Sequence, residues 1–340
     1  MIPVIICGGV GTKMWPLSTP TLPKQFLPLI ADRSLFELNW EMLRNRYQPE
    51  EIFIQTNQEQ AKIIKKLVPE VVEDNIFLEP ESRNQGPATG LAAALLKKLG
   101  RGDEPFFLIQ VDVLRNPSEK FFLSMDLAEK LATSSDQYIS GGFVPTRMLK
   151  GVDFLLKGKQ VGELGEAKIF EVDEFVYRND LEKIRDNFKT GRLLVHTNHT
   201  SMTPNNLLKM FHKYRPDWYG PLAKIATGSD IRTEFQKMPK GALEEVTKKA
   251  IPDRKFLVIE HPFEWTDFGT WESLDKYYAD NDMSPKNGGT VEIESTNAFC
   301  YSESKMKIAI IGLNDVVIVE GNGGILVCKK DKCGSVGQIV

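Results

Sequence analysis

The chain has 340 residues, of which 41% are apolar and 26% charged, with a formal net charge of -3 at pH 7. This length predicts one large domain with a smaller appendage, and the near-neutral charge argues against a nucleic-acid or acidic-membrane partner. The cysteines Cys7, Cys300, Cys328 and Cys333 form no CxxC pair, which disfavours a structural zinc site or a disulfide framework. We expect a cytoplasmic chain, since no stretch approaches the roughly 20 apolar residues of a membrane span and no basic n-region begins a signal peptide.

The first half of the chain alternates short β-branched runs with helical patterns, as βαβ units do. We predict strands at 2–7, 51–56, 75–78 and 106–111, and helices at 35–46, 58–68 and 88–99. The continuously apolar run 106–111 is typical of a strand that a parallel sheet buries on both faces. This order predicts an α/β fold with a doubly wound, mostly parallel, Rossmann-like sheet.

After residue 138 the pattern predicts an inserted or edge sheet, against which a substrate could lie. Its strands are expected at 138–143, 154–156 and 168–175, followed by helices at 181–188, 205–214 and 242–250 and a strand at 256–260. The tail consists of short strands broken by glycine and asparagine. We therefore predict a catalytic domain at 1–283 and a C-terminal β domain at 284–340, whose strand edges could pair with a second copy in a homodimer or fold back on the chain.

A glycine-rich segment, Cys7-Gly8-Gly9-Val10-Gly11-Thr12-Lys13, directly follows the first predicted strand. Glycines permit positive φ and let backbone N–H groups approach a phosphate, so the segment predicts a phosphate cradle. Lys13 and Lys24 would add positive charge. Neither GxxxxGK[ST] nor GxGxxG fits, which disfavours ordinary kinases and dehydrogenases. The alternative is an ordinary turn from strand to helix.

Several motifs, in chain order, resemble those of the sugar-1-phosphate nucleotidyltransferases. The run GGVGTKMWPLSTPTLPKQF resembles that family's signature, and its WPLS and PKQF parts are similar to the mannose-1-phosphate guanylyltransferase branch. The pairs Glu79-Pro80, Arg83-Asn84 and Pro87-Ala88 resemble EPxxRNTAPA, and WTDFGTW at 265–271 resembles WxDxGxW. The tail segments STNAFCYSESK, DVVIVE and ILVCKKD are similar to the branch's C-terminal β segment, which implies a left-handed β-helix-like form.

The resemblance implies that a sugar 1-phosphate attacks the α-phosphorus of a nucleoside triphosphate and releases pyrophosphate. GTP and mannose 1-phosphate are the best-matched substrates, with Mg²⁺ as cofactor. The implied residues are Lys13, Lys24 and Arg178 for catalysis; Gly8, Gly9, Gly11, Thr12, Arg83, Asn84 and Gln85 for the nucleotide; Gly151, Asn198 and Trp265 for the sugar; and Asp112 and Asp267 for the metal. Asp112 also follows the strand 106–111, where the crevice of a parallel sheet forms.

Several of these residues also have a structural interpretation. Asp112 and Asp267 could be solvated or helix-capping aspartates, and Asn84 could cap the helix that follows it, which is compatible with a contact to the base. Arg178 could be a solvated charge at a strand end, and Trp265 could belong to a core. The histidines His196, His199, His212 and His261 show no ligand spacing and predict surface or packing roles.

The chain departs from the family pattern mainly on the sugar side. Arg178 stands where the family's FVEKP has lysine, and Lys13 stands where its loop has arginine, although the two side chains differ in donor geometry. The family's GYGYI appears as Gly151-Val152-Asp153-Phe154-Leu155, and Lys248 stands for a usual glutamate. These changes leave two alternatives beside a mannose-1-phosphate guanylyltransferase: an enzyme for another sugar 1-phosphate or base, and a weakly active or inactive paralogue that binds nucleotide-sugar and regulates a partner.

Overall fold

The structure is a computed structural model that describes residues 1–9, 11–149 and 151–339. The chain folds into two compact units, each built from segments that are distant in sequence. Unit 1 comprises Met1–Cys7, Met42–Gln110 and Arg115–Trp265, and unit 2 comprises Gly8–Glu41, Val111–Leu114 and Thr266–Val340. The signature segment at 8–26 thus belongs to the same unit as the C-terminal strands. The domain boundary at residue 283 remains a prediction.

Unit 1 is organised around a ten-stranded sheet with the order β11-β8-β7-β9-β6-β10-β4-β1-β2-β3. The parallel part, β4-β1-β2-β3, consists of β1 (Ile2–Ile6), β2 (Phe53–Thr56), β3 (Ile76–Leu78) and β4 (Phe106–Gln110). The four predicted strands of the first half are therefore present, each shorter by one or more residues at an end. The α/β class is confirmed.

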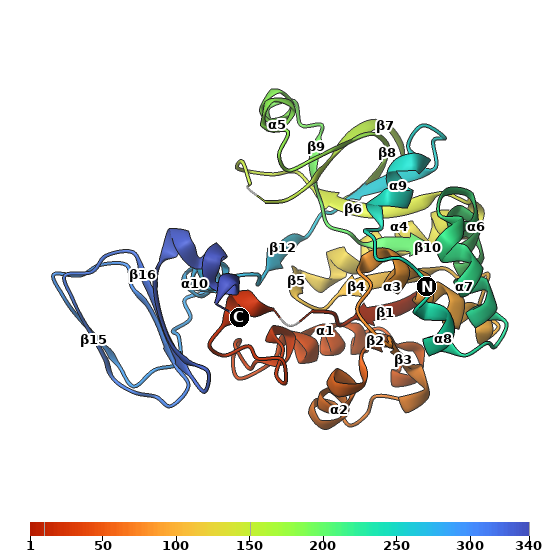
Figure 1. Cartoon of the computed structure of the whole chain (residues 1–340). Coiled ribbons are helices and arrows are strands. Elements are labelled where there is room, and N and C mark those ends of the chain that lie inside the picture. The colour runs from red at the N-terminus through yellow and green to blue at the C-terminus, as the bar shows by residue number, and fades with distance from the viewer. Residues whose placement is uncertain (10, 150, 340) are drawn as a thin grey trace. The chain divides into compact units, whose positions relative to one another are not determined.

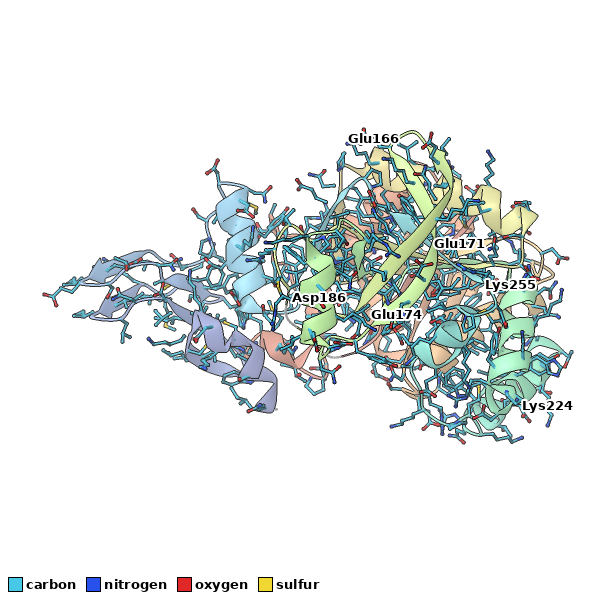
Figure 2. The ribbon with its side chains drawn as sticks, turned by 90° about the horizontal axis from the view of Figure 1, so that it is seen from above. Glu166, Glu171, Glu174, Asp186, Lys224 and Lys255 are labelled. Atoms are coloured by element: carbon cyan, nitrogen blue, oxygen red, sulfur yellow. The ribbon has the colours of Figure 1, made fainter. Side chains whose placement is uncertain are left out.

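The other strands complete the sheet with mainly antiparallel pairs. They are β6 (Tyr138–Phe143), β7 (Phe154–Leu164), β8 (Ala167–Val176), β9 (Leu193–His196), β10 (Thr200–Met202) and β11 (Phe256–Glu260), of which β11 and β6 pair in parallel. The sequence prediction ended β7 at Leu156, because the exposed half of the β7–β8 hairpin carries polar residues. Figure 2 shows this hairpin with Glu166 at its turn and Glu171 and Glu174 along β8.

Helices cover both faces of this sheet. They are α2 (Gln58–Leu67), α3 (Gln85–Lys98), α4 (Ser118–Ser134), α5 (Leu181–Phe188), α6 (Pro204–Tyr214), α7 (Pro216–Ala226), α8 (Ile231–Phe235) and α9 (Glu244–Ala250). Alternate residues of β4 point to opposite faces: Phe106 belongs to the core shared with α3, α6 and α7, whereas Phe107 packs edge-on against Phe121 of α4. Figure 1 shows α6 and α7 beside each other.

Helix α4 was not predicted. It begins after Pro117, and its buried side includes Ser124 as well as Phe121 and Met125, which weakens the apolar periodicity. The short strands β5 (Val113–Asn116) and β12 (Glu264–Asp267), which pair with each other, were also missed. No helix within the described ranges is long and apolar enough to cross a membrane.

Unit 2 has its own core beneath the signature segment. The short helices η1 (Thr12–Met14) and η2 (Lys24–Phe26) precede α1 (Leu35–Arg44), and α10 (Trp271–Asp280) follows β12. The core combines residues from all parts of the unit, including Met14, Leu17, Phe268, Trp271 and Val317. Trp271 also donates its indole N–H to the carbonyl oxygen of Trp15 at 2.9 Å.

The C-terminal strands wind into coils that repeat every 18 residues. Strand β13 (Thr290–Ile293) pairs in parallel with β15 (Ile308–Ile311), and β14 (Phe299–Ser302) with β16 (Val316–Gly321), at the same sequence offset. Side chains also pair across this offset, as Asn314 accepts from the N–H of Thr296 at 2.8 Å. Strand β17 (Gly324–Lys329) returns antiparallel to β16 and leads into η5 (Lys330–Gln338). This β-helix, in blue in Figure 1, confirms the predicted β appendage.

Candidate functional site

The signature segment turns at two glycines with positive φ. Gly9 has a φ of 75° and Gly11 a φ of 71°, values that L side chains rarely adopt. Gly11 is also crowded, because a Cβ atom there would lie 2.3 Å from Cγ of Lys24. At Gly8 and Gly9, by contrast, a Cβ atom would meet no described atom within 4 Å. The backbone at these two glycines is therefore open to a group as large as a phosphate.

Two buried polar side chains hold this segment in shape. Ser18 Oγ donates to the carbonyl oxygen of Gly11 at 2.8 Å, and Gln25 Nε2 donates to that of Gly9 at 3.4 Å. Both side chains are buried, so water competes little for these bonds. Ser18 and Gln25 belong to the WPLS and PKQF motifs, which thus act as supports for the glycines. The PKQF run was expected to give the loop a rigid shape, but neither side chain was predicted to donate to these carbonyl oxygens.

Lys24, Asp112 and Asp267, predicted for catalysis and metal binding, lie together in unit 2. Lys24 Nζ donates to Asp112 Oδ2 at 2.8 Å and lies 3.5 Å from the carbonyl oxygen of Phe268. The backbone N–H of Phe268 donates to the carbonyl oxygen of Asp112 at 3.3 Å, which joins the two aspartate segments. Loss of hydration, and then the charge of Asp112, raise the pKa of Asp267, whereas Lys24 and Lys13 oppose this shift.

A buried asparagine fixes the position of Asp112. Asn39 Nδ2 donates to the carbonyl oxygens of Leu35, Val111 and Val113 at 2.9, 3.1 and 3.0 Å. Two of these carbonyls flank Asp112, so α1 holds the backbone on both sides of the carboxylate. Nothing in the sequence distinguishes Asn39 from any other helical asparagine, so its role was not predicted.

The donor set around Asp112 fits Mg²⁺ better than a softer metal. The described residues contain no group of three or more His, Cys, Asp or Glu side chains that could hold a metal ion. Mg²⁺ needs no such group, because it binds through one or two carboxylates and completes its shell with water and substrate phosphates. The two aspartates, whose charges already disfavour each other, match that requirement.

The C-terminal segment packs against the start of the signature segment within unit 2. Thr12 and Lys13 open η1, and a Cβ atom added to Gly337 of η5 would lie 3.0 Å from Thr12 Oγ1 and 3.4 Å from Lys13 Cγ. Lys13 remains exposed to solvent. Phe268 and Trp271, the other aromatic residues of the WTDFGTW motif, are buried in the core.

In unit 1, Arg83, Asn84 and Gln85 form the turn that begins α3. Asn84 has a φ of 69°, and its side-chain oxygen accepts from the N–H of Gln85 at 2.8 Å, so the predicted cap is present. Arg83 Nε donates to Glu81 Oε1 at 2.8 Å, and its Nη1 bonds the carbonyl oxygen of Met238. The contact of these three residues with a base remains a prediction.

Arg178 is paired with an aspartate of the motif that contains Gly151. Its backbone N–H and Nε donate to Asp153 Oδ1 at 2.9 and 3.1 Å, and its Nη2 donates to Asp153 Oδ2 at 2.5 Å. Gly151 has a φ of 76° and lies two residues before this aspartate. The structure therefore brings Gly151 and Arg178, predicted separately, to one place in unit 1.

Asn198 and Trp265 lie around a buried histidine. Asn198 has a φ of 54° in the turn between β9 and β10, and its carbonyl oxygen accepts from Gln110 Nε2 at 2.5 Å. The ring of Trp265 lies 5.1 Å from that of His199, and the Arg115 guanidinium lies 5.4 Å from the Trp265 ring. Trp265 is half-buried.

The histidines confirm the prediction of packing and surface roles. His199 and His261 are buried, and their rings lie 4.9 Å apart. Burial, reinforced by the nearby Arg115 charge, lowers the pKa of His261 to about 3, and burial lowers that of His196 to about 4. His212 is exposed.

Two family models match the chain. Residues 2–132 match the nucleotidyl transferase model, and residues 288–340 match the MannoseP isomerase/GMP-like beta-helix domain. The second match begins two residues before β13 and covers the 18-residue coils. The two matches therefore fall on the signature segment with its parallel sheet, and on the β-helix.

Known proteins resemble the chain along its whole length. A mannose-1-phosphate guanylyltransferase of Salmonella muenchen is 28% identical over 356 residues, which cover 100% of this chain and 72% of the relative. A mannose-1-phosphate guanylyltransferase of Escherichia coli (strain K12) is 25% identical, with 100% and 73% covered. The crystal structure of a mannose-1-phosphate geranyltransferase from Thermus thermophilus aligns with a TM-score of 0.86 at 21% identity, over 99% of this chain and 97% of that one. At 21% identity, the similarity to the Thermus thermophilus structure shows only that the two chains share a fold.

Proposed function

Because residues 2–132 belong to the nucleotidyl transferase family and residues 288–340 to the MannoseP isomerase/GMP-like β-helix domain family, we propose that this chain joins GTP and mannose 1-phosphate to give GDP-mannose and pyrophosphate. The observation that carries the proposal is the association of Lys24 with Asp112 beside Asp267 in unit 2. Lys24 and Asp267 come from two separate motifs and Asp112 from the end of the strand 106–111, and nucleotidyl transfer needs a positive charge and a bound metal ion at one place. The names of the relatives supply the choice of GTP and mannose 1-phosphate.

The reaction places its demands on charge and alignment. A phosphate oxygen of the sugar 1-phosphate forms a bond to the α-phosphorus of GTP, and the bond from that phosphorus to the bridging oxygen of pyrophosphate breaks. No covalent enzyme intermediate is needed. The glycine backbone at Gly8, Gly9 and Gly11, with Thr12, binds the triphosphate, and Lys13 and Lys24 balance the charge that grows on the departing pyrophosphate.

Asp112 and Asp267 would hold Mg²⁺. When bound, the ion would polarise the α-phosphoryl group and neutralise part of the pyrophosphate charge. Lys24 already neutralises Asp112 in the ligand-free chain, and its ammonium group has further donors for a phosphate oxygen. Asn39 keeps Asp112 at a fixed place while its partners change.

The residues of unit 1 are assigned to the base and the sugar. Asn84 and Gln85 would contact guanine from the rigid turn before α3, which Arg83 stabilises through Glu81 and Met238. Arg178 would bind the phosphate of mannose 1-phosphate, and Gly151, Asn198 and Trp265 would surround the sugar. The partial exposure of Trp265 supports this role, because sugars pack on aromatic rings through their apolar faces.

The Asp153–Arg178 pair also favours a second candidate, a nucleotidyltransferase for another sugar 1-phosphate. The family pattern has glycine and lysine at these two positions, so the sugar side of this chain differs in charge and in shape. A third candidate, the weakly active or inactive paralogue, rests on the exchanged Lys13 and Arg178. Turnover separates the three candidates.

Pyrophosphate release with Mg²⁺ tests the proposal. The purified chain is given GTP, ATP, UTP or CTP with mannose 1-phosphate or another sugar 1-phosphate, and we expect release with GTP and mannose 1-phosphate. Asp112→Ala and Asp267→Ala should abolish it, whereas Asp280→Ala, an exposed aspartate of α10 in unit 2, should not. Release with another pair only would support the second candidate, and tight binding of nucleotide-sugar without any release would support the third.

A further inference from the structure

Two departures from the family pattern contact each other in unit 1. Asp153 stands at the second glycine of GYGYI and Arg178 at the lysine of FVEKP, and the two residues lie beside the paired ends of β7 and β8, where Phe154 is opposite Val176. Asp153 accepts three hydrogen bonds from Arg178, two of them from the guanidinium. The two exchanges therefore form one structural change.

The contact fixes which side of the guanidinium a ligand can reach. Asp153 binds the edge formed by Nε and Nη2, and Nη1 has no hydrogen-bond partner among the described residues. The Arg178 side chain is 57% exposed and that of Asp153 is 17% exposed, so the anchor is shielded while the free edge meets solvent. A planar guanidinium held in this way presents its remaining N–H groups in one direction.

The groups around Asp153 keep it ionised and in place. Burial alone would raise its pKa, but the hydrogen bonds and charge of Arg178 lower the pKa below its ordinary value. The backbone N–H of His196 donates to the carbonyl oxygen of Asp153 at 2.9 Å. Glu244 lies next to His196, and burial raises its pKa, so Asp153 is the more acidic of the two carboxyl groups. The charge that orients Arg178 is thus present at neutral pH.

We propose that Asp153 is a positioning residue for the second substrate: it holds Arg178 edge-on, so that Nη1 binds the phosphate of the sugar 1-phosphate. This inference rests on the proposed function. A lysine at position 178 could not bind Asp153 and the phosphate through separate groups, because its single ammonium group would pair with Asp153. The aspartate and the arginine therefore depend on each other, and the lysine of the family pattern suits only a chain that has no carboxylate at position 153.

Steady-state kinetics of pyrophosphate release test the dependence. Asp153→Asn keeps an oxygen for the backbone N–H of Arg178 but lets the guanidinium move, and should raise KM for mannose 1-phosphate about tenfold with KM for GTP unchanged. Arg178→Lys should raise it further, because Asp153 captures the new ammonium group. The double variant should be no worse than Asp153→Asn alone, so that removal of the carboxylate rescues the lysine.

The control is the ion pair of Asp173 with Arg192, which joins β8 to the residue before β9 and has no assigned role. Arg192 Nη2 lies 2.6 Å from Oδ2 of Asp173, a residue of β8. Asp173→Asn should leave both KM values unchanged. A lower KM for mannose 1-phosphate in Asp153→Asn, or additive effects in the double variant, would overturn the inference, because the carboxylate would then only weaken Arg178.

Binding measurements separate this inference from the proposed activity. The dissociation constant of mannose 1-phosphate is measured by calorimetry for the wild type and Asp153→Asn. Binding that weakens about tenfold without any turnover in the wild type supports the role of Asp153 and contradicts the activity. Turnover with equal KM values in both proteins contradicts the role of Asp153 alone, and absence of both binding and turnover contradicts both.

Discussion

Lys24 Nζ and Asp112 Oδ2 are 2.8 Å apart, so the lysine forms an ion pair with the carboxylate that the proposed function assigns to Mg²⁺. Lys24→Met should lower kcat by about two to three orders of magnitude, since a charge that stabilises the departing pyrophosphate is lost. The same change removes a competitor for Asp112, so half-maximal rate should occur at a lower Mg²⁺ concentration. Rate is measured against Mg²⁺ concentration at saturating substrates. An unchanged kcat would show that Lys24 takes no part in the reaction.

Gly11→Ala tests the crowded turn of the signature segment. The added Cβ would overlap with Cγ of Lys24 and strain a backbone with a φ of 71°, so we expect a loss of about 1–3 kcal/mol in the free energy of unfolding and a raised KM for GTP. Denaturant unfolding and kinetics provide the two readouts. Gly334→Ala is the control, because a Cβ there meets no described atom within 4 Å. Equal behaviour of the two variants would contradict the assigned shape of the turn.

Asn39→Leu should weaken Mg²⁺ binding, although Asn39 acts only through the backbone on either side of Asp112. The variant leaves the carbonyl oxygens of Val111 and Val113 without this donor, at a cost of about 1–3 kcal/mol in the free energy of unfolding. The segment around Asp112 should then shift, and the Mg²⁺ concentration needed for half-maximal rate should rise. Asn281→Ala, which removes an exposed bond to the carbonyl oxygen of Tyr277, serves as the matched control. The prediction fails if Asn39→Leu leaves the Mg²⁺ dependence unchanged.

The buried His196 predicts a loss of stability in mild acid. Burial lowers its pKa from 6.5 to about 4, although the charge of Asp153 acts in the opposite direction. Between these values the unfolded chain binds a proton that the folded chain does not, so this contribution to stability is complete above pH 6.5 and is lost as the pH falls. Between pH 6.5 and about pH 5 the loss approaches about 2 kcal/mol.

Urea unfolding at the two pH values measures this loss. His196→Gln should lose less stability on acidification than the wild type, because glutamine does not titrate. The exposed His212→Gln should lose as much as the wild type. Equal losses in all three proteins would contradict the prediction, because they would mean that His196 has the same pKa in the folded and the unfolded chain.

The sequence predicted the parallel half of the sheet well, because its strands are buried on both faces and have few polar residues, as in 106–111. It predicted less of the antiparallel half, where β9 and β10 are short and β7 continues into exposed residues. The 18-residue repeat was not recognised in the sequence, because two coils show each position only twice. Equivalent positions also carry different residues: Glu294 and Gly312, 18 residues apart, both have positive φ.

For the site, motifs supplied the charged residues, and the structure supplied their partners. Lys24 and Asp267 were predicted from two motifs and Asp112 from the resemblance and its place after the strand 106–111, and the structure brings the three together. Asn39 and Gln25 were not predicted, because a buried amide acts through carbonyl oxygens that no pattern of side chains reveals. The pairing of Asp153 with Arg178 was likewise invisible, since 25 residues separate them in the chain.

The packing of η5 on Thr12 joins two segments of unit 2 that are far apart in the chain. During synthesis the signature segment leaves the ribosome before most of unit 1, and Gly337 leaves it after all of unit 1. Thr12 therefore cannot contact Gly337 until the β-helix has been synthesised. Until η5 emerges, a nascent chain lacks this contact at Thr12 and Lys13. The contact between η5 and the signature segment can therefore form only after the rest of unit 2 has been synthesised.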